Sequence, residues 1–163
     1  DYYASRGLGD VYKRQLYCLM TSALIVLSVI DYRTYEIPFG INVFLFVLGV
    51  IRCVFGKGDR GTLMIGFFAV SLFLLLLSLL TRGAAIGGGD IKLMAAVGLL
   101  LGWKLIILAF VMGCIAGSVV HLFRMKVCGA GRMLALGPYL SVGIFIAALW
   151  GNGMIDWYLG LFM

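Results

Sequence analysis

The chain is poor in charge and in the side chains that bind metals or form disulfides. Only 12% of its 163 residues are charged, whereas soluble proteins carry about 25%. It contains one histidine and four cysteines, and no two cysteines form a CxxC pair. A disulfide framework, a metal site and a bound cofactor are therefore not expected. The net charge is +6, but the sequence has no basic cluster with interleaved aromatics, so nucleic acid is not an expected partner.

The sequence is rich in apolar residues, which form runs long enough to cross a lipid bilayer. Hydrophobic residues make up 63% of the chain, and the mean hydropathy is +1.10. A spanning helix needs roughly 18 apolar residues, and several runs approach or exceed this length. We predict an all-α, polytopic protein of the cell membrane with about six transmembrane helices. Their approximate ranges are 16–30, 37–55, 62–80, 86–101, 105–123 and 134–150.

The two ends of the chain are set apart from these spans. Residues 1–15 are polar and lack the apolar region of a signal peptide. They look like a translated assembly remnant, and we expect a non-native or disordered tail. Residues 16–163 are expected to form a single membrane-embedded domain. The final segment, MIDWYLGLFM, is too short to span, and its Trp157 and Tyr158 suit a membrane interface.

Lysine and arginine residues in the loops set the predicted orientation. With residues 1–15 left out, one side of the membrane carries six of them and the other carries four; counting Arg6, Lys13 and Arg14 would reverse the balance. Because the more positive loops stay in the cytoplasm, the side with six is predicted to be cytoplasmic. The six are Arg33, Arg82, Lys92, Arg124, Lys126 and Arg132; the four are Arg52, Lys57, Arg60 and Lys104.

Two acids lie at the ends of predicted spans. Asp31 ends the first span and Asp90 begins the fourth, so the chain crosses the membrane twice between them. Two crossings return the chain to the face it left, and both acids are therefore expected near one face. Gly137-Pro138, at the start of the sixth span, falls on the same face. Outside the tail, Glu36 is the other acid on this face and a rival partner for either aspartate.

Paired carboxylates can hydrolyse a peptide bond without a metal or a covalent nucleophile. When they are held close together, they share one proton and titrate as a unit. The ionised carboxylate takes a proton from water, while the protonated one donates to the scissile carbonyl. Gly87, Gly88 and Gly89 precede Asp90 and would let an extended substrate backbone approach it.

Three segments resemble the motifs of a known family. GGGDIK at 87–92 matches the GxGD signature of intramembrane aspartyl proteases. DYRTYEIP at 31–38 is similar to the first catalytic motif of the type IV prepilin peptidases, and ALGPYLSVG at 135–143 is similar to their third. The motifs occur in the family's order. The chain resembles a short form of this family that lacks the N-terminal CxxC region.

The resemblance implies a membrane aspartyl endopeptidase in which Asp31 and Asp90 are the catalytic pair. It implies prepilin-like or pseudopilin precursors as substrates, of the Flp/Tad type or related, with a short basic leader that ends in glycine before an apolar helix. Cleavage is expected near the cytoplasmic face. The further motif residues expected at the substrate cleft are Gly87, Gly88, Gly89, Lys92, Ile37, Pro38, Gly137 and Pro138.

The chain departs from the family in two ways. Family members often carry Asn or Asp directly after Ile-Pro, whereas here Phe39 and Gly40 follow and Asn42 comes later. The paired CxxC motifs associated with methylation of the new N-terminus are absent from this sequence. The resemblance therefore gives no expectation for methyltransferase activity.

Other interpretations of the same residues stay open. The acids could form a relay in a small proton-coupled transporter or channel subunit, or belong to a non-catalytic assembly subunit. Asp90 could be a carboxylate stabilised at a helix N-terminus. Glu36 could be a solvated loop acid, and Lys92 a side chain that reaches the lipid headgroups. Gly137-Pro138 could simply begin a helix.

Overall fold

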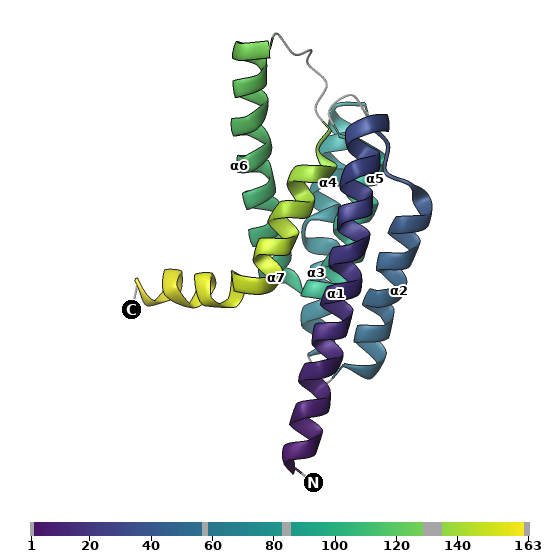
Figure 1. The fold of residues 1–163 in the computed structure, drawn as a ribbon, viewed down its shortest axis with the longest axis vertical. Helices are drawn as coiled ribbons and strands as arrows, with labels where there is room; N and C mark the ends of the chain where they lie inside the picture. Colours follow the sequence, from purple (N-terminus) through teal and green to yellow (C-terminus); the bar gives the residue numbers. More distant parts are fainter. Residues whose placement is uncertain (1, 57–58, 83–85, 129–134, 162–163) are drawn as a thin grey trace.

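The fold is a bundle of helices. In the computed structural model, residues 2–56, 59–82, 86–128 and 135–161 are described, and these ranges contain helices and connections but no strand. Figure 1 shows most of the helices running roughly side by side along the longest axis of the molecule. The helices are α1 (Tyr2–Thr34), α2 (Phe39–Phe55), α3 (Arg60–Ala69), α4 (Ser71–Leu80), α5 (Gly88–Leu101), α6 (Trp103–Cys128) and α7 (Gly137–Gly160).

Helices α3 and α4 form one span, so the described helices agree with the six predicted. They meet at Val70, whose backbone stays helical (φ −96°, ψ −38°) and whose carbonyl accepts the amide of Leu74 at 2.9 Å. Four segments are long and apolar enough to cross a membrane, and α2 is a shorter apolar helix. The prediction of an all-α, polytopic membrane protein is confirmed. The four long segments are Val11–Thr34, Arg60–Leu80, Trp103–Val127 and Gly137–Gly160.

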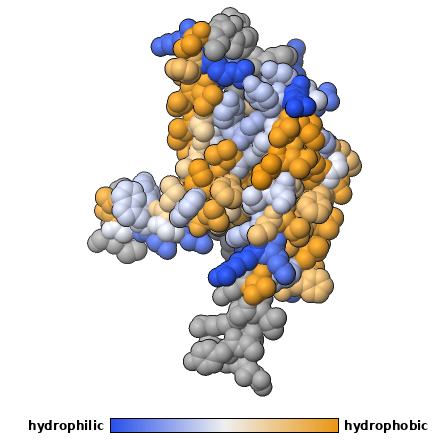
Figure 2. All heavy atoms as spheres, viewed as in Figure 1, coloured by the Kyte–Doolittle hydropathy of each residue, from blue (hydrophilic) through white to orange (hydrophobic). Residues whose placement is uncertain are grey.

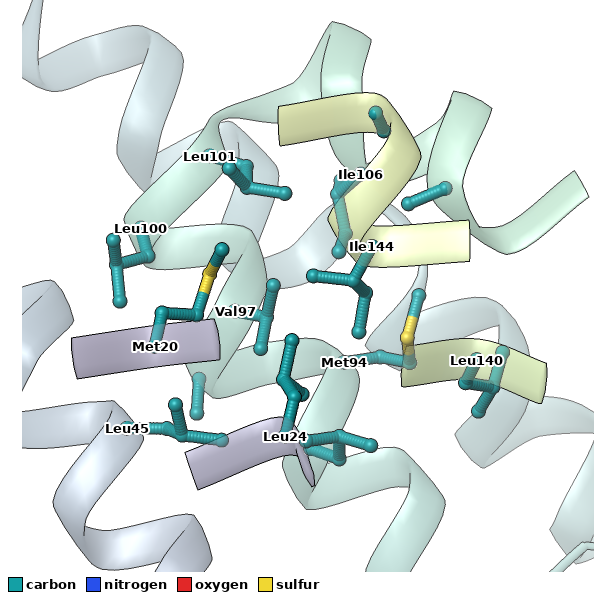
Figure 3. Close-up of a cluster of buried hydrophobic side chains, with 14 of the residues drawn as sticks. Met20, Leu24, Leu45, Met94, Val97, Leu100, Leu101, Ile106, Leu140 and Ile144 are labelled. Atoms are coloured by element: carbon teal, nitrogen blue, oxygen red, sulfur yellow. The ribbon is translucent and has the colours of Figure 1, made fainter. Parts of the chain in front are cut away.

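Helix α5 lies at the centre of the apolar core. From Leu93 to Leu101 all but one of its residues are buried, because it packs against α2, α3, α4, α6 and α7. Figure 3 shows how side chains from α1, α2, α6 and α7 converge on it. The labelled residues of this cluster are Met20, Leu24, Leu45, Met94, Val97, Leu100, Leu101, Ile106, Leu140 and Ile144.

Helices α3 and α5 approach each other at a pair of glycines. A Cβ added to Gly66 would collide with the backbone of Gly98, and one added to Gly98 would collide with the backbone of Gly66. Small residues of this kind let helices pack backbone to backbone in lipid, where no hydrophobic force drives them together. This contact fixes α5, and with it the position of its N-terminus.

The outer surface of the bundle is apolar, as a lipid-facing surface must be. Figure 2 shows hydrophobic residues over much of the visible face, with hydrophilic residues gathered mainly towards the ends. Large exposed side chains on α4 include Phe73, Leu76, Leu79 and Leu80, the last of which is 81% exposed. The bilayer is the solvent that suits such a surface.

Two elements extend further than the sequence predicted. Helix α1 begins at Tyr2 and continues through the segment expected to be a tail, and Tyr12 packs against the core. Helix α7 runs to Gly160, beyond the predicted end at residue 150, and Figure 1 shows its last part bending away from the bundle.

Candidate active site

The end of α1 and the start of α5 meet at one end of the bundle. Asp31, in the last turn of α1, and Asp90, in the first turn of α5, line one cavity of about 260 Å³. The structure therefore brings together the two acids that the parity of the crossings placed on one face. The other residues lining this cavity, called the dyad cavity below, are Tyr35, Glu36, Ile37, Gly87, Gly88 and Gly89.

Asp31 is held by the first residue of α7. Its side chain is 4% exposed, and its Oδ2 accepts the backbone N–H of Gly137 at 2.9 Å. The first N–H groups of a helix have no partner within the helix, so a carboxylate is favourable there. Pro138 follows in the same first turn, where its missing N–H costs nothing. Gly137-Pro138 thus begins a helix and also fixes Asp31.

A glycine is required at position 137 for steric reasons. A Cβ at this position would lie 2.6 Å from Oδ2 and 2.9 Å from Cγ of Asp31. Such contacts essentially never occur, so any side chain here would displace the carboxylate. The contact with Asp31 therefore explains why a glycine stands at position 137.

Asp90 lies in a helix turn that has little side-chain support of its own. The N-cap residue is Gly87, which provides no side-chain hydrogen bond, and the amide of Asp90 donates to the Gly87 carbonyl at 3.1 Å. A Cβ at Gly88 would meet nothing within 4 Å, and one at Gly87 would lie 3.4 Å from Oδ2 of Asp90. The glycines therefore leave open space beside the carboxylate.

The connection between α1 and α2 turns sharply over the dyad cavity. Tyr35 follows the end of α1 with φ +56°, and its amide donates to the carbonyl of Asp31 at 2.8 Å. Glycine usually occupies this left-handed position after a helix, so a tyrosine there is strained. The turn directs Ile37 onto Gly89, where a Cβ would lie 2.9 Å from Cβ of Ile37. Pro38 then forms the N-cap of α2.

Glu36, the rival acid that the sequence places on this face, lines the dyad cavity, and so does Tyr35, which the sequence does not predict there. Glu36 is exposed, as a loop acid should be, yet it borders the same cavity as both aspartates. The left-handed turn at Tyr35 places it there. No sequence signal marks that turn, because the usual marker would be a glycine or asparagine.

Four of the residues expected at the substrate cleft do not line the dyad cavity, namely Pro38, Lys92, Gly137 and Pro138. Of these, Lys92 lies elsewhere on α5. It is exposed, and its Nζ lies 5.4 Å from the centre of the Phe39 ring, a cation–π contact. It lines a second cavity of about 260 Å³, whose walls are otherwise mostly apolar. Asn42 also lines this second cavity. Sequence reasoning noted Asn42 only as the asparagine that comes late after Ile37-Pro38, although an amide within an apolar span is itself a signal.

The chemistry of the site comes from its carboxylates and its backbone. Within the described ranges, no three histidine, cysteine or acidic side chains are grouped so that they could hold a metal ion. The arrangement provides two acids from distant parts of the chain, one nearly buried and one beside open glycines. Two carboxyl groups in one cavity are the side chains that general acid–base catalysis requires.

Most of the chain is similar in sequence to known proteins. Residues 18–122 match the type IV leader peptidase family. The prepilin leader peptidase/N-methyltransferase of Legionella pneumophila is 32% identical over 99% of this chain and 58% of its own length. The proteins of the same name from Bacillus subtilis and Pseudomonas aeruginosa are 31% and 27% identical, over 85% and 96% of this chain and 56% and 57% of theirs. The chain thus spans somewhat more than half the length of these relatives. No solved structure matches it.

Proposed function

Because the chain belongs to the type IV leader peptidase family, we propose that it is a membrane aspartyl endopeptidase that cleaves the leaders of prepilin-like or pseudopilin precursors. The observation that carries this proposal is the dyad cavity, which Asp31 and Asp90 line from helices far apart in the sequence. The proposal does not extend to the N-methyltransferase activity in the names of the relatives, because the chain covers only 58% of the length of the Legionella protein.

The proposed reaction uses both carboxylates as proton carriers. One aspartate, ionised, takes a proton from a water molecule, and the water oxygen bonds to the scissile carbonyl carbon. The other aspartate, protonated, donates its proton to the carbonyl oxygen. The C–N bond then breaks as the first aspartate gives its new proton to the leaving nitrogen and the second takes one from a hydroxyl on the tetrahedral carbon, which restores the carbonyl and the starting protonation states. Each acid changes protonation state during the cycle, so neither can be replaced by an amide.

The substrate would lie extended across the start of α5. Gly88 has open space where a side chain would be, and Gly87 has only Asp90 nearby, so a peptide backbone can come close to the carboxylate. The dyad cavity is at one end of the bundle, which suits a bond just outside the membrane-spanning helix of a precursor. The positive loops favour the cytoplasmic face for this end.

A proton relay through the membrane fits the described residues less well. Such a relay needs polar groups along the whole path across the bilayer. In the described part of the chain, the central cluster around α5 is apolar, and the buried polar side chains are Asp31, Asn42, Ser71 and Ser141. The two aspartates lie together at one end, which favours hydrolysis there over transport.

The proposal is tested by co-expressing the chain with a prepilin-like protein from the same genome and following the mass of the precursor. We expect leader loss with the unaltered chain and none with Asp31→Asn or Asp90→Asn, although both variants should accumulate in membranes. The amide keeps the shape of the carboxylate but cannot exchange protons. Near-normal processing by either variant would refute the proposed pair.

A further inference from the structure

Asn42 is a buried polar side chain that the proposed reaction does not use. It lies in the first turn of α2 and is 5% exposed. Its Nδ2 donates to the carbonyl oxygen of Gly89 at 3.4 Å, across 47 residues of sequence. Its Oδ1 has no hydrogen-bond partner among the described residues. Burying an amide costs free energy unless hydrogen bonds compensate for the lost water.

The carbonyl that Asn42 contacts belongs to the residue just before Asp90. The first turn of α5 begins with glycines, which lose more backbone entropy in a helix than any other residue. Its N-cap, Gly87, makes no side-chain cap bond. The turn that carries Asp90 therefore has a weak intrinsic tendency to form, and contacts from outside must stabilise it.

The start of α2 and the connection before it supply those contacts. Ile37 packs against Gly89 so closely that a Cβ there would lie 2.9 Å away. Asn42 adds the one side-chain hydrogen bond to this turn from another described helix. Further along, Gly49 of α2 approaches the backbone of Ala96, where an added Cβ would lie 3.2 Å from the carbonyl oxygen. Helix α2 thus holds α5 by packing at its middle and by a directional bond at its start.

We propose that Asn42 is a positioning residue: its amide fixes the first turn of α5, and through it the carboxylate of Asp90 relative to Asp31. The proposal rests on the proposed function for its effect on rate, but the contact itself is independent of that function. Asn42 takes no part in proton transfer. Its loss therefore slows the reaction by letting Asp90 move, since small displacements of a catalytic group cost large factors in rate.

The test compares Asn42→Leu, which keeps the branching of the side chain at Cγ, with Asn42→Ala, which truncates it. Both remove the donor. We expect kcat for a prepilin-like substrate to fall about tenfold in both, with KM within about twofold of the unaltered chain. The matched control is Ser71→Ala, which removes a buried hydroxyl of α4 that donates to Phe67 within its own span. Unchanged kcat in both Asn42 variants would overturn the proposal.

A second measurement does not depend on activity. Hydrogen–deuterium exchange of the full chain in detergent micelles measures the exchange rates of the backbone amides of residues 91–94, which donate the hydrogen bonds of the first turns of α5. We expect faster exchange there in both Asn42 variants, with α6 unchanged and with Ser71→Ala like the unaltered chain. The positioning role would be overturned if residues 91–94 of the Asn42 variants exchanged at the rate of the unaltered chain, or if exchange rates rose uniformly across all helices. If the unaltered chain cleaves no precursor, the proposed function fails while this measurement still decides on Asn42.

Discussion

Replacing Gly137 by alanine should separate the placement of Asp31 from the folding of the bundle. The added Cβ would lie 2.6 Å from Oδ2 of Asp31, so the carboxylate must retreat by about 0.8 Å to reach an ordinary contact of 3.4 Å. The hydrogen bond from the Gly137 amide, 2.9 Å long, would be stretched or lost at the same time. Displacements near 1 Å can cost about a hundredfold in rate. We therefore expect kcat for precursor cleavage to fall about a hundredfold.

The assay measures kcat on purified, detergent-solubilised protein with a prepilin-like precursor, after the amount in membranes has been equalised. The matched control is Gly153→Ala in the same helix, where an added Cβ meets nothing within 4 Å. That variant should cleave at the unaltered rate. If Gly137→Ala also cleaves at the unaltered rate, Asp31 tolerates displacement, and the reasoning from the Gly137 contact is refuted.

Three further predictions concern the surroundings of the pair. Glu36→Gln should stay within about threefold of the unaltered rate, because Glu36 is exposed and screened by solvent; a loss as complete as that of Asp31→Asn would make Glu36 the catalytic partner. Chelation with EDTA should leave cleavage unchanged, since the dyad activates water by itself; activity lost with EDTA and restored by zinc would indicate a metalloprotease. In a variant without native cysteines, a cysteine at Thr34 should react with an impermeant thiol reagent only after the membrane is opened, whereas one at Arg60 should react in intact cells; labelling of Thr34 from outside would place the dyad on the other face.

The helices and the meeting of the two acids could be predicted from the sequence because both depend on patterns along the chain. Apolar runs identify spans whatever their partners are. Counting crossings requires no coordinates, and it placed Asp31, Asp90 and Gly137 at one end of the bundle, where the structure has them.

The finer geometry could not be predicted, because it depends on contacts between distant segments. Nothing in the motif GGGDIK indicates that Lys92 packs on the ring of Phe39. The left-handed turn at Tyr35 occurs without the glycine that normally marks it. The contact of Asn42 with Gly89 joins residues that are 47 apart, and no local rule relates them.

The hydrogen bond between Asp31 and Gly137 also has a consequence for the synthesis and membrane insertion of the protein. It joins residues that are 106 positions apart, from α1 to the start of α7. During synthesis both aspartates would enter the bilayer well before α7 leaves the ribosome. Asp31 would therefore pass through most of the insertion without the contact that holds it in the structure. Under the proposed function, Asp31 would be set for cleavage only after the start of α7 has been inserted.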